Sequence, residues 1–154
     1  MNLSIRNAET CDLRQINELA KQVQALHVEL RPDIYLPNET IISGERFEEL
    51  LDEGIVFVGE IDGKIISYAV CFINIKDNPL ITRKKVLFVD AIGNDFNFRG
   101  CGIGRQMMEY IYNYAGSLSC DKLELHVNSN NKNAIEFYEH LGMTEKSKIL
   151  EIDL

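Results

Sequence analysis

The chain has 154 residues, of which 45% are apolar and 26% are charged, and this composition predicts one domain, residues 1–154, with a substantial core. Its formal charge of −8 argues against nucleic acid as a partner, because such binding depends on Lys and Arg that neutralise phosphates. The same charge suits a cationic amine substrate.

No basic and then apolar signal segment opens the chain, and no apolar run approaches membrane-spanning length. The cysteines are far apart, with no CxxC pair and no histidine placed to complete a zinc site: Cys11, Cys71, Cys101 and Cys120. We therefore expect reduced thiols, no metal, no membrane partner and a cytoplasmic location.

The first half of the chain predicts one strand and two helices. Alternation over residues 3–7 indicates the strand, and Thr10 is placed to cap an amphipathic helix over residues 13–30. Ser43 caps a second helix, which Gly54 ends.

Strands follow in the middle of the chain. Two of them, over residues 55–61 and 64–75, are joined by an Asp-Gly dipeptide, the strongest short hairpin signal. Residues 76–83 are expected to form a loop to the next strand, whose apolar run covers residues 86–89.

Helices and strands alternate in the last third. In order we expect a helix over residues 103–115 closed by Gly116, a strand over residues 123–127, a helix from Asn130 or Asn131 to Gly142, and a last strand within residues 143–154. The order β-α-α-β-β-β-α-β-α-β predicts a mixed α/β domain.

A glycine-rich turn, Arg-Gly-Cys-Gly-Ile-Gly over residues 99–104, joins the apolar strand to the helix that follows it. Its alternate glycines let a ligand approach the backbone, and a helix that starts there directs unpaired NH groups and the positive end of its dipole outward. This arrangement predicts a phosphate site. No Gly-Lys-Ser/Thr follows, as a Walker loop requires, and no βαβ repeat with a terminal acidic residue follows, as a dinucleotide fold requires.

Two ordered motifs resemble those of the GNAT superfamily of N-acetyltransferases. The first is Arg99-x-x-Gly102-x-Gly104 between a hydrophobic strand and an amphipathic helix. The second is a strand, asparagine, helix, tyrosine and Leu-Gly over residues 123–143, with Met143 in the place of the usual Phe. The resemblance covers most of the chain and implies the GNAT fold, a mixed, mostly antiparallel sheet flanked by helices, with acetyl-CoA as cosubstrate.

The resemblance implies that acetyl-CoA binds where the strand before the glycine turn splays from the next strand. Its pantetheine arm is expected to bond to the backbone of Ile92 and Asn94 and to contact Asn131. The pyrophosphate is expected among the residues of the turn: Arg99, Gly100, Cys101, Gly102, Ile103, Gly104 and Arg105. Gly93 lies where the family usually has a side chain.

Acetyl transfer to an amine needs a neutral amine and a proton for the departing thiolate. The resemblance implies Tyr138 as the acid, although a tyrosine at helical spacing can also simply pack the helix against the sheet. His126 occupies the position at which ribosomal-protein alanine acetyltransferases carry a catalytic glutamate, and histidine exchanges protons near neutral pH. Asp90 and Glu124 are rival bases, and each of the three can equally be a solvated or hydrogen-bonded side chain.

The acceptor is expected to lie under the first two helices and the loop over residues 32–42, where the resemblance is weakest. Glu29, Asp33 and Tyr35 are the polar and aromatic candidates there, whereas His27 is expected to be structural. The predicted acceptor is a primary amine of a small molecule, such as a polyamine, an aminoglycoside or an amino acid, or of a protein N-terminus.

Two other functions fit part of this pattern. A catalytically silent acyl-CoA-binding module would bind the cosubstrate without turnover, and a phosphate-binding regulatory domain would prefer nucleotides. A homodimer is a further expectation, because the last strand and an exposed sheet edge can pair two subunits.

Overall fold

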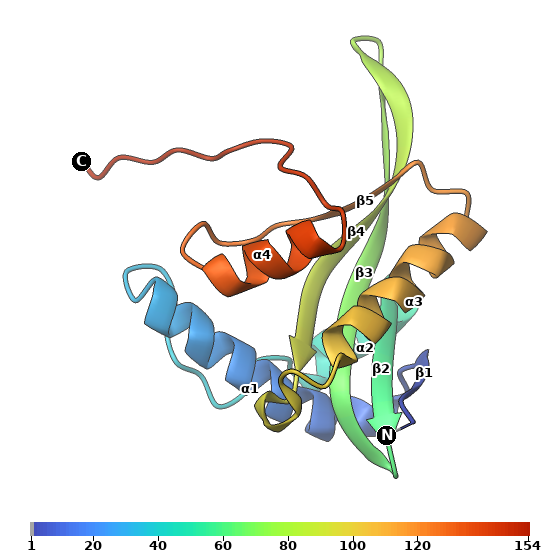
Figure 1. Cartoon of the computed structure of the whole chain (residues 1–154), viewed down its shortest axis with the longest axis vertical. Coiled ribbons are helices and arrows are strands. Elements are labelled where there is room, and N and C mark those ends of the chain that lie inside the picture. Colours follow the sequence, from blue (N-terminus) through green and yellow to red (C-terminus); the bar gives the residue numbers. More distant parts are fainter. Residues whose placement is uncertain (1) are drawn as a thin grey trace.

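The computed structural model describes residues 2–154 and contains one five-stranded sheet (Figure 1). The strands are β1 (Ser4–Asn7), β2 (Ile55–Ile61), β3 (Lys64–Asn78), β4 (Ile81–Asn94) and β5 (Lys122–Leu125). They lie side by side in sequence order, the first four antiparallel and β5 parallel to β4. The predicted mixed α/β class with a mostly antiparallel sheet is confirmed.

Helices cover both faces of this sheet. They are α1 (Leu13–Leu30), α2 (Gly44–Glu53), α3 (Ile103–Ser117) and α4 (Lys132–His140), with short 3-10 helices η1 (Thr10–Asp12) and η2 (Phe96–Phe98). α1 and α2 pack on one face, and α3 and α4 pack on the other. In the described part of the chain, no helix is long and apolar enough to cross a membrane.

Alternation along the strands supplies both apolar cores. The core under α1 and α2 contains Ile16, Phe47, Val58, Tyr68 and Val70. The core under α3 and α4 contains Phe57, Ala69, Leu87, Met107 and Ile111. Neighbours such as Phe57 and Val58 therefore point to opposite faces, as the period of a strand requires.

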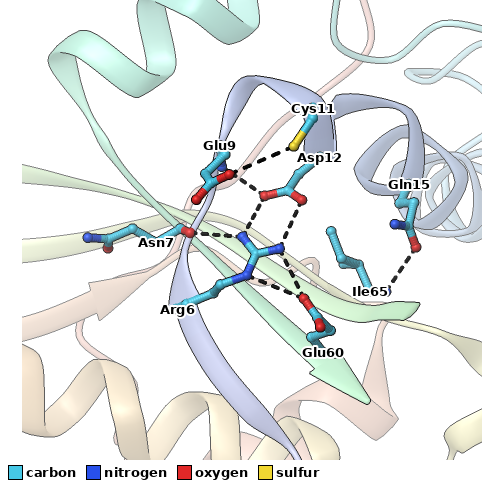
Figure 2. A network of polar contacts seen from close by, with 8 residues as sticks. All are labelled: Arg6, Asn7, Glu9, Cys11, Asp12, Gln15, Glu60 and Ile65. Carbon is cyan, nitrogen blue, oxygen red and sulfur yellow. Dashed lines mark hydrogen bonds and ion pairs between the residues drawn. The ribbon is translucent and has the colours of Figure 1, made fainter. Parts of the chain in front are cut away.

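Arg6 on β1 binds the start of α1 to the edge of the sheet (Figure 2). Its Nη1 and Nη2 donate to the Asp12 carboxylate at 2.7 and 3.0 Å, and Nη2 also donates to Glu60 Oε2 on β2 at 3.0 Å. The hydrogen bonds from Arg6 hold the pKa of the buried Asp12 carboxyl below its usual value. Asp12 also accepts from the Glu9 backbone N–H at 2.8 Å, so the prediction of Thr10 as the helix cap is wrong.

The predicted loop over residues 76–83 is also wrong, because β3 and β4 continue through most of it. Their ladder reaches the pair Asn78↔Ile81, and the two strands form a ribbon that extends beyond the rest of the sheet (Figure 1). Most side chains of the ribbon are exposed, so no apolar alternation marks it in the sequence.

Several predicted elements of the last third differ from the structure. The strand predicted over residues 123–127 ends at Leu125, so His126 lies beyond it. Gly116 lies inside α3, which ends at Ser117, and Ser119 provides the left-handed residue beyond it with φ of 55°. The predicted last strand is not formed, because the described residues place no strand beside residues 144–154, all of which are exposed. The rest of the predicted element order is present.

Candidate active site

An open backbone edge appears where β4 and β5 part. The two strands pair from Val86↔Lys122 to Val89↔Leu125, and β5 then ends. β4 continues to Asn94, bonded to β3 on its other side. The last residues of β4 thus have no strand neighbour on the β5 side in the described chain, and an extended ligand with amide groups can bond there as an added strand would.

Gly93 lies in this open part of β4, and only glycine fits its surroundings. A Cβ at this position would lie 2.5 Å from Cε1 of Tyr68 and 2.8 Å from Cγ2 of Val23. Burial, together with the nearby charge of Asp90, raises the pKa of Tyr68 to about 12. Tyr68 and Val23 therefore occupy the space that a side chain would take, which explains the departure from the family pattern; the sequence contained no other signal for Tyr68.

The glycines of the turn serve two different purposes. Gly100 and Gly102 have φ of +75° and +77°, a conformation that other residues rarely adopt, and a Cβ on either would meet nothing within 4 Å. Gly104 is helical, but its Cβ would lie 3.2 Å from Nδ2 of Asn94 and 3.3 Å from Cζ of Phe137. The first two glycines shape the turn, and the third allows α3 to approach β4 and α4 closely.

The turn presents a row of unbonded backbone amides. α3 begins at Ile103 with Gly102 as its N-cap. The first helical N–H that donates to a carbonyl of this turn is that of Gln106, which bonds to the Gly102 carbonyl. Within residues 2–154 the following amides donate no hydrogen bond: Gly102, Ile103, Gly104 and Arg105. With the positive end of the helix dipole, they form an anion site of the predicted kind.

Two arginines flank these amides with exposed side chains. Cζ of Arg99 lies 3.8 Å from the ring centroid of Phe96, a cation–π contact. Nη1 of Arg105 lies 3.6 Å from Oε1 of Glu109, a loose surface contact. The exposed Cys101 lies between them in the turn. Both cations are free to turn toward a phosphate group.

The predicted pantetheine contacts border the open edge. Asn94 ends β4, and its Oδ1 accepts from Oγ of the buried Ser67 at 2.7 Å, a contact that no sequence pattern indicates. Ile92 packs in the core under α3 and α4, which leaves its backbone at the strand edge. Asn131 is the N-cap of α4 as predicted, and its Oδ1 accepts from the Ala134 N–H at 3.2 Å.

Tyr138 lies on α4 with its ring against the core under α3 and α4. The rings of Tyr138 and Phe137 are 5.2 Å apart, and burial raises the pKa of the Tyr138 phenol. Its hydroxyl makes no hydrogen bond to any described residue. The hydroxyl oxygen is also not fully enclosed by protein, so it stays accessible to a ligand or to solvent. The side chain thus packs the helix and also keeps a neutral, unengaged O–H.

The three candidate bases differ in their surroundings. Glu124 on β5 accepts from Nζ of Lys146 at 2.5 Å and of Lys76 at 3.2 Å, and these bonds lower the pKa of its carboxyl. His126, just beyond the end of β5, is exposed, and its ring lies edge-on to Phe88 at 5.0 Å. Asp90 lies at a register shift in β4, exposed and without a hydrogen bond to any described side chain. Glu124 is engaged, whereas His126 and Asp90 are open.

The predicted acceptor residues lie at the end of α1 and in the loop after it. His27 and Tyr35 stack with centroids 4.9 Å apart, and burial lowers the pKa of His27. Asp33 is held by Arg31 at 2.8 and 2.6 Å, so its carboxylate is already neutralised. Glu29 is exposed. Of the predicted acceptor residues, Glu29 and Tyr35 remain available to a ligand.

The start of α4 approaches this region from the other side. Nδ2 of Asn130 donates to the Leu30 carbonyl at 3.3 Å, which links the loop before α4 to the end of α1. α1 and α4 pack on opposite faces of the sheet, and Figure 1 shows both of them near the end of β4, where β4 and β5 part. The open strand edge, the glycine turn and the candidate acceptor residues therefore border one region of the molecule.

Comparisons with known proteins agree with this geometry. The acetyltransferase (GNAT) family model matches residues 18–143. An uncharacterized N-acetyltransferase, MJ1207 of Methanocaldococcus jannaschii, is 37% identical over 98 residues, which are 64% of this chain and 42% of that protein. The chain thus spans less than half the length of this curated relative.

Solved structures share the fold over nearly the whole chain. A tetramutant of the BH1408 protein from Bacillus halodurans has a TM-score of 0.94 and 30% identity, with coverage of 98% of this chain and 99% of that one. The aminoglycoside N-acetyltransferase AAC(6')-Iy, solved in complex with CoA, has a TM-score of 0.72 and 18% identity, with 98% of both chains covered.

The chain belongs to the GNAT family of acetyltransferases. The resemblance seen in the sequence is confirmed. A phosphate-binding domain unrelated to acyl transfer is no longer a tenable alternative.

Proposed function

We propose that this protein, acting through residues 1–154 as a single domain, transfers the acetyl group of acetyl-CoA directly to a primary amine. The observation that carries the proposal is the combination, in one place, of an open β4 edge with a turn of unbonded amides at the start of α3. An extended amide chain ending in a pyrophosphate matches both features, whereas a nucleotide alone would use only the second.

In this proposal the backbone of Ile92 and Asn94 binds the pantetheine arm, and Asn131 contacts it from the start of α4. The turn from Arg99 to Arg105 surrounds the pyrophosphate: Gly100, Cys101, Gly102, Ile103 and Gly104 contribute backbone and the arginines contribute charge. Support comes from the unbonded amides and from the absence of strong ion pairs on either arginine in the described chain. The bond from Ser67 fixes the end of β4 on which this binding depends.

Tyr138 is proposed as the general acid. The acceptor amine attacks the thioester carbonyl carbon to form the C–N bond, the bond from that carbon to sulfur breaks, and Tyr138 gives its phenolic proton to the departing sulfur. The nitrogen releases its surplus proton to water, and the Tyr138 phenolate takes a proton back from water. Burial supports this role because it keeps the phenol protonated, and the hydroxyl has no competing partner in the described chain.

His126 is proposed as the group that takes a proton from the acceptor ammonium, directly or through water. Its exposure leaves it accessible, and Asp90 remains a rival because it is equally open. Glu124 is disfavoured, because two lysines already stabilise its charge and weaken it as a base.

The acceptor is proposed to be a cationic amine, either a small molecule or a protein N-terminus. The charge of −8 and the exposed Glu29 near the end of α1 favour a cation. The name of AAC(6')-Iy makes aminoglycosides one class to test here, next to polyamines, amino acids and peptides. A cytoplasmic location stays a prediction.

The test is release of free thiol from acetyl-CoA over a panel of these amines. We expect release with one amine class, and a loss of about 10²-fold in kcat for Tyr138→Phe. Tyr112→Phe is the matched control, because Tyr112 is 69% exposed on α3 and should change nothing. Acetyl-CoA binding without release from any amine would favour the silent acyl-CoA-binding module, and unchanged kcat in Tyr138→Phe would remove its role as acid.

A further inference from the structure

The short helix η2, Phe96–Phe98, joins the two halves of the candidate active site. β4, with its open edge, ends at Asn94, and the glycine turn begins at Arg99. A single turn of 3-10 helix has little stability of its own, because several residues must be ordered for each hydrogen bond that forms. The placement of the turn relative to the strand edge therefore depends on what holds η2.

Asp95 holds the start of η2 with both oxygens of a buried carboxylate. Its Oδ1 accepts from the backbone N–H of Asn97 at 3.0 Å and from Nδ2 of the same residue at 2.8 Å. Its Oδ2 accepts from Nζ of Lys64 on β3 at 2.8 Å, and Asp95 is only 3% exposed. Burial alone would raise the pKa of this carboxyl, but the hydrogen bonds from Lys64 and Asn97 together hold it below its usual value. Asp95 is thus an anion at neutral pH.

Contacts from α1 and β3 complete the hold on η2. The Phe96 N–H donates to Oε1 of Gln22 on α1 at 2.8 Å. Nζ of Lys64, at the start of β3, lies 5.4 Å from the centroid of the Phe98 ring and also bonds to Asp95. One side chain thus connects η2 to α1, and another connects it to β3.

The glycine turn takes its starting position from η2. Cζ of Arg99 lies 3.8 Å from the centroid of the Phe96 ring, and the Arg99 N–H donates to the Phe96 carbonyl at 3.3 Å. The Cys101 N–H donates to the Phe98 carbonyl at 3.2 Å. A shift of η2 would therefore move the Arg99 cation and the amides that follow it relative to the edge of β4.

A contribution to stability alone does not account for this arrangement. A buried ion pair adds little net stability, because the cost of removing the charges from water offsets their attraction. An acidic side chain is also unfavourable near a site for an anion, unless it holds the groups that bind the anion. Asp95 does the latter, since the turn with its unbonded amides starts from the helix that this carboxylate caps.

We propose that Asp95, Lys64 and Gln22 are positioning residues for acetyl-CoA. They fix η2 so that the pantetheine arm can bond to the edge of β4 while the pyrophosphate lies in the turn, and they act through η2 without a part in the chemistry. The proposal rests on the proposed function, because one ligand must use both the strand edge and the turn. Through Gln22 the same contacts connect α1, which carries predicted acceptor residues, to the cosubstrate turn.

Isothermal titration of the full chain with acetyl-CoA tests this proposal. We expect three variants, Asp95→Asn, Lys64→Met and Gln22→Met, each to raise the Kd for acetyl-CoA by ~5-fold or more, because each removes a hydrogen bond that holds η2. Lys64→Arg keeps a cation for Asp95 and should bind acetyl-CoA within ~2-fold of the parent protein.

The direction of the change separates positioning from a simple effect of charge. Asp95→Asn removes a negative charge and Lys64→Met removes a positive one, so charge alone would tighten the binding of this anionic ligand in the first variant and weaken it in the second. A lower or unchanged Kd in Asp95→Asn would overturn the proposal. Gln22→Met changes no charge and keeps a good helix former in α1, so an unchanged Kd in this variant would overturn the proposal even if Asp95→Asn does not fold.

Asp12→Asn is the matched control for Asp95→Asn. Asp12 is 4% exposed and bonds to the cation of Arg6, but it makes no hydrogen bond to the described residues of η2 or of the glycine turn. It should lose stability yet bind acetyl-CoA within ~2-fold of the parent protein. Equal increases in Kd in the two variants would overturn the proposal, because a general loss of stability would explain both. A parent protein that does not bind acetyl-CoA would overturn the proposed function itself, and the positioning role with it.

Discussion

Replacing Gly93 by alanine tests the packing that shapes the open end of β4. The added Cβ would lie 2.5 Å from Tyr68 and 2.8 Å from Val23, distances at which the ring or the helix must move. Because the ring is buried between α1 and the sheet, we expect a loss of about 1–3 kcal/mol in unfolding free energy. For a chain of this size the loss corresponds to a fall of roughly 2–12 °C in Tm.

Differential scanning calorimetry measures this change, and Gly116→Ala is the matched control. Gly116 lies within α3 with nothing within 4 Å of an added Cβ, so the same substitution should raise stability by up to about 1 kcal/mol. Adding Val23→Ala to Gly93→Ala should recover at least about 0.5 kcal/mol relative to the sum of the single changes. A Tm of Gly93→Ala within ~1 °C of the parent protein would refute the reasoning.

Three further outcomes follow from the same structure. Burial raises the pKa of Tyr138, so the alkaline fall in rate that depends on this group should lie above pH ~10. A fall in rate near neutral pH that disappears in Tyr138→Phe would contradict the raised pKa. Asp12→Asn should cost about 1–3 kcal/mol at pH 7, because the Arg6 bonds are weakened. The folded-state pKa of Asp12 is depressed, so the difference in unfolding free energy between the two proteins should persist at neutral pH and shrink only as pH falls below ~3.9. Urea unfolding measures this difference. A difference that grows on acidification would be inconsistent with the ion pair. Gly102→Ala should raise the Kd for acetyl-CoA by about 5–30-fold through strain at its φ of +77°, and calorimetric binding unchanged from the parent would show that the turn tolerates a side chain.

Much of this fold could be predicted from periodicity and caps. α1 begins and ends where the apolar spacing indicated, and Ser43 and Asn131 cap their helices through side-chain oxygens. The glycine turn was visible because a left-handed φ and a close helix approach both select glycine, a constraint that is local in the sequence.

What the sequence could not give depends on contacts between distant residues. The fit of Tyr68 over Gly93, the bond from Ser67 to Asn94 and the engagement of Glu124 by Lys146 join residues that no spacing rule connects. A last strand was predicted within residues 143–154 from the apolar Ile149 and Ile152, and it is not formed, because strand pairing requires a neighbour and the described chain supplies none.

Isothermal titration of the full chain with acetyl-CoA and, separately, with ATP tests the central claim, that the open β4 edge and the amides at the start of α3 form one site. The two ligands share phosphates, but only acetyl-CoA has an amide arm that can bond to the strand edge. We expect acetyl-CoA to bind with a Kd at least ~10-fold lower than that of ATP. Equal affinities, or no detectable binding of acetyl-CoA, would contradict the account.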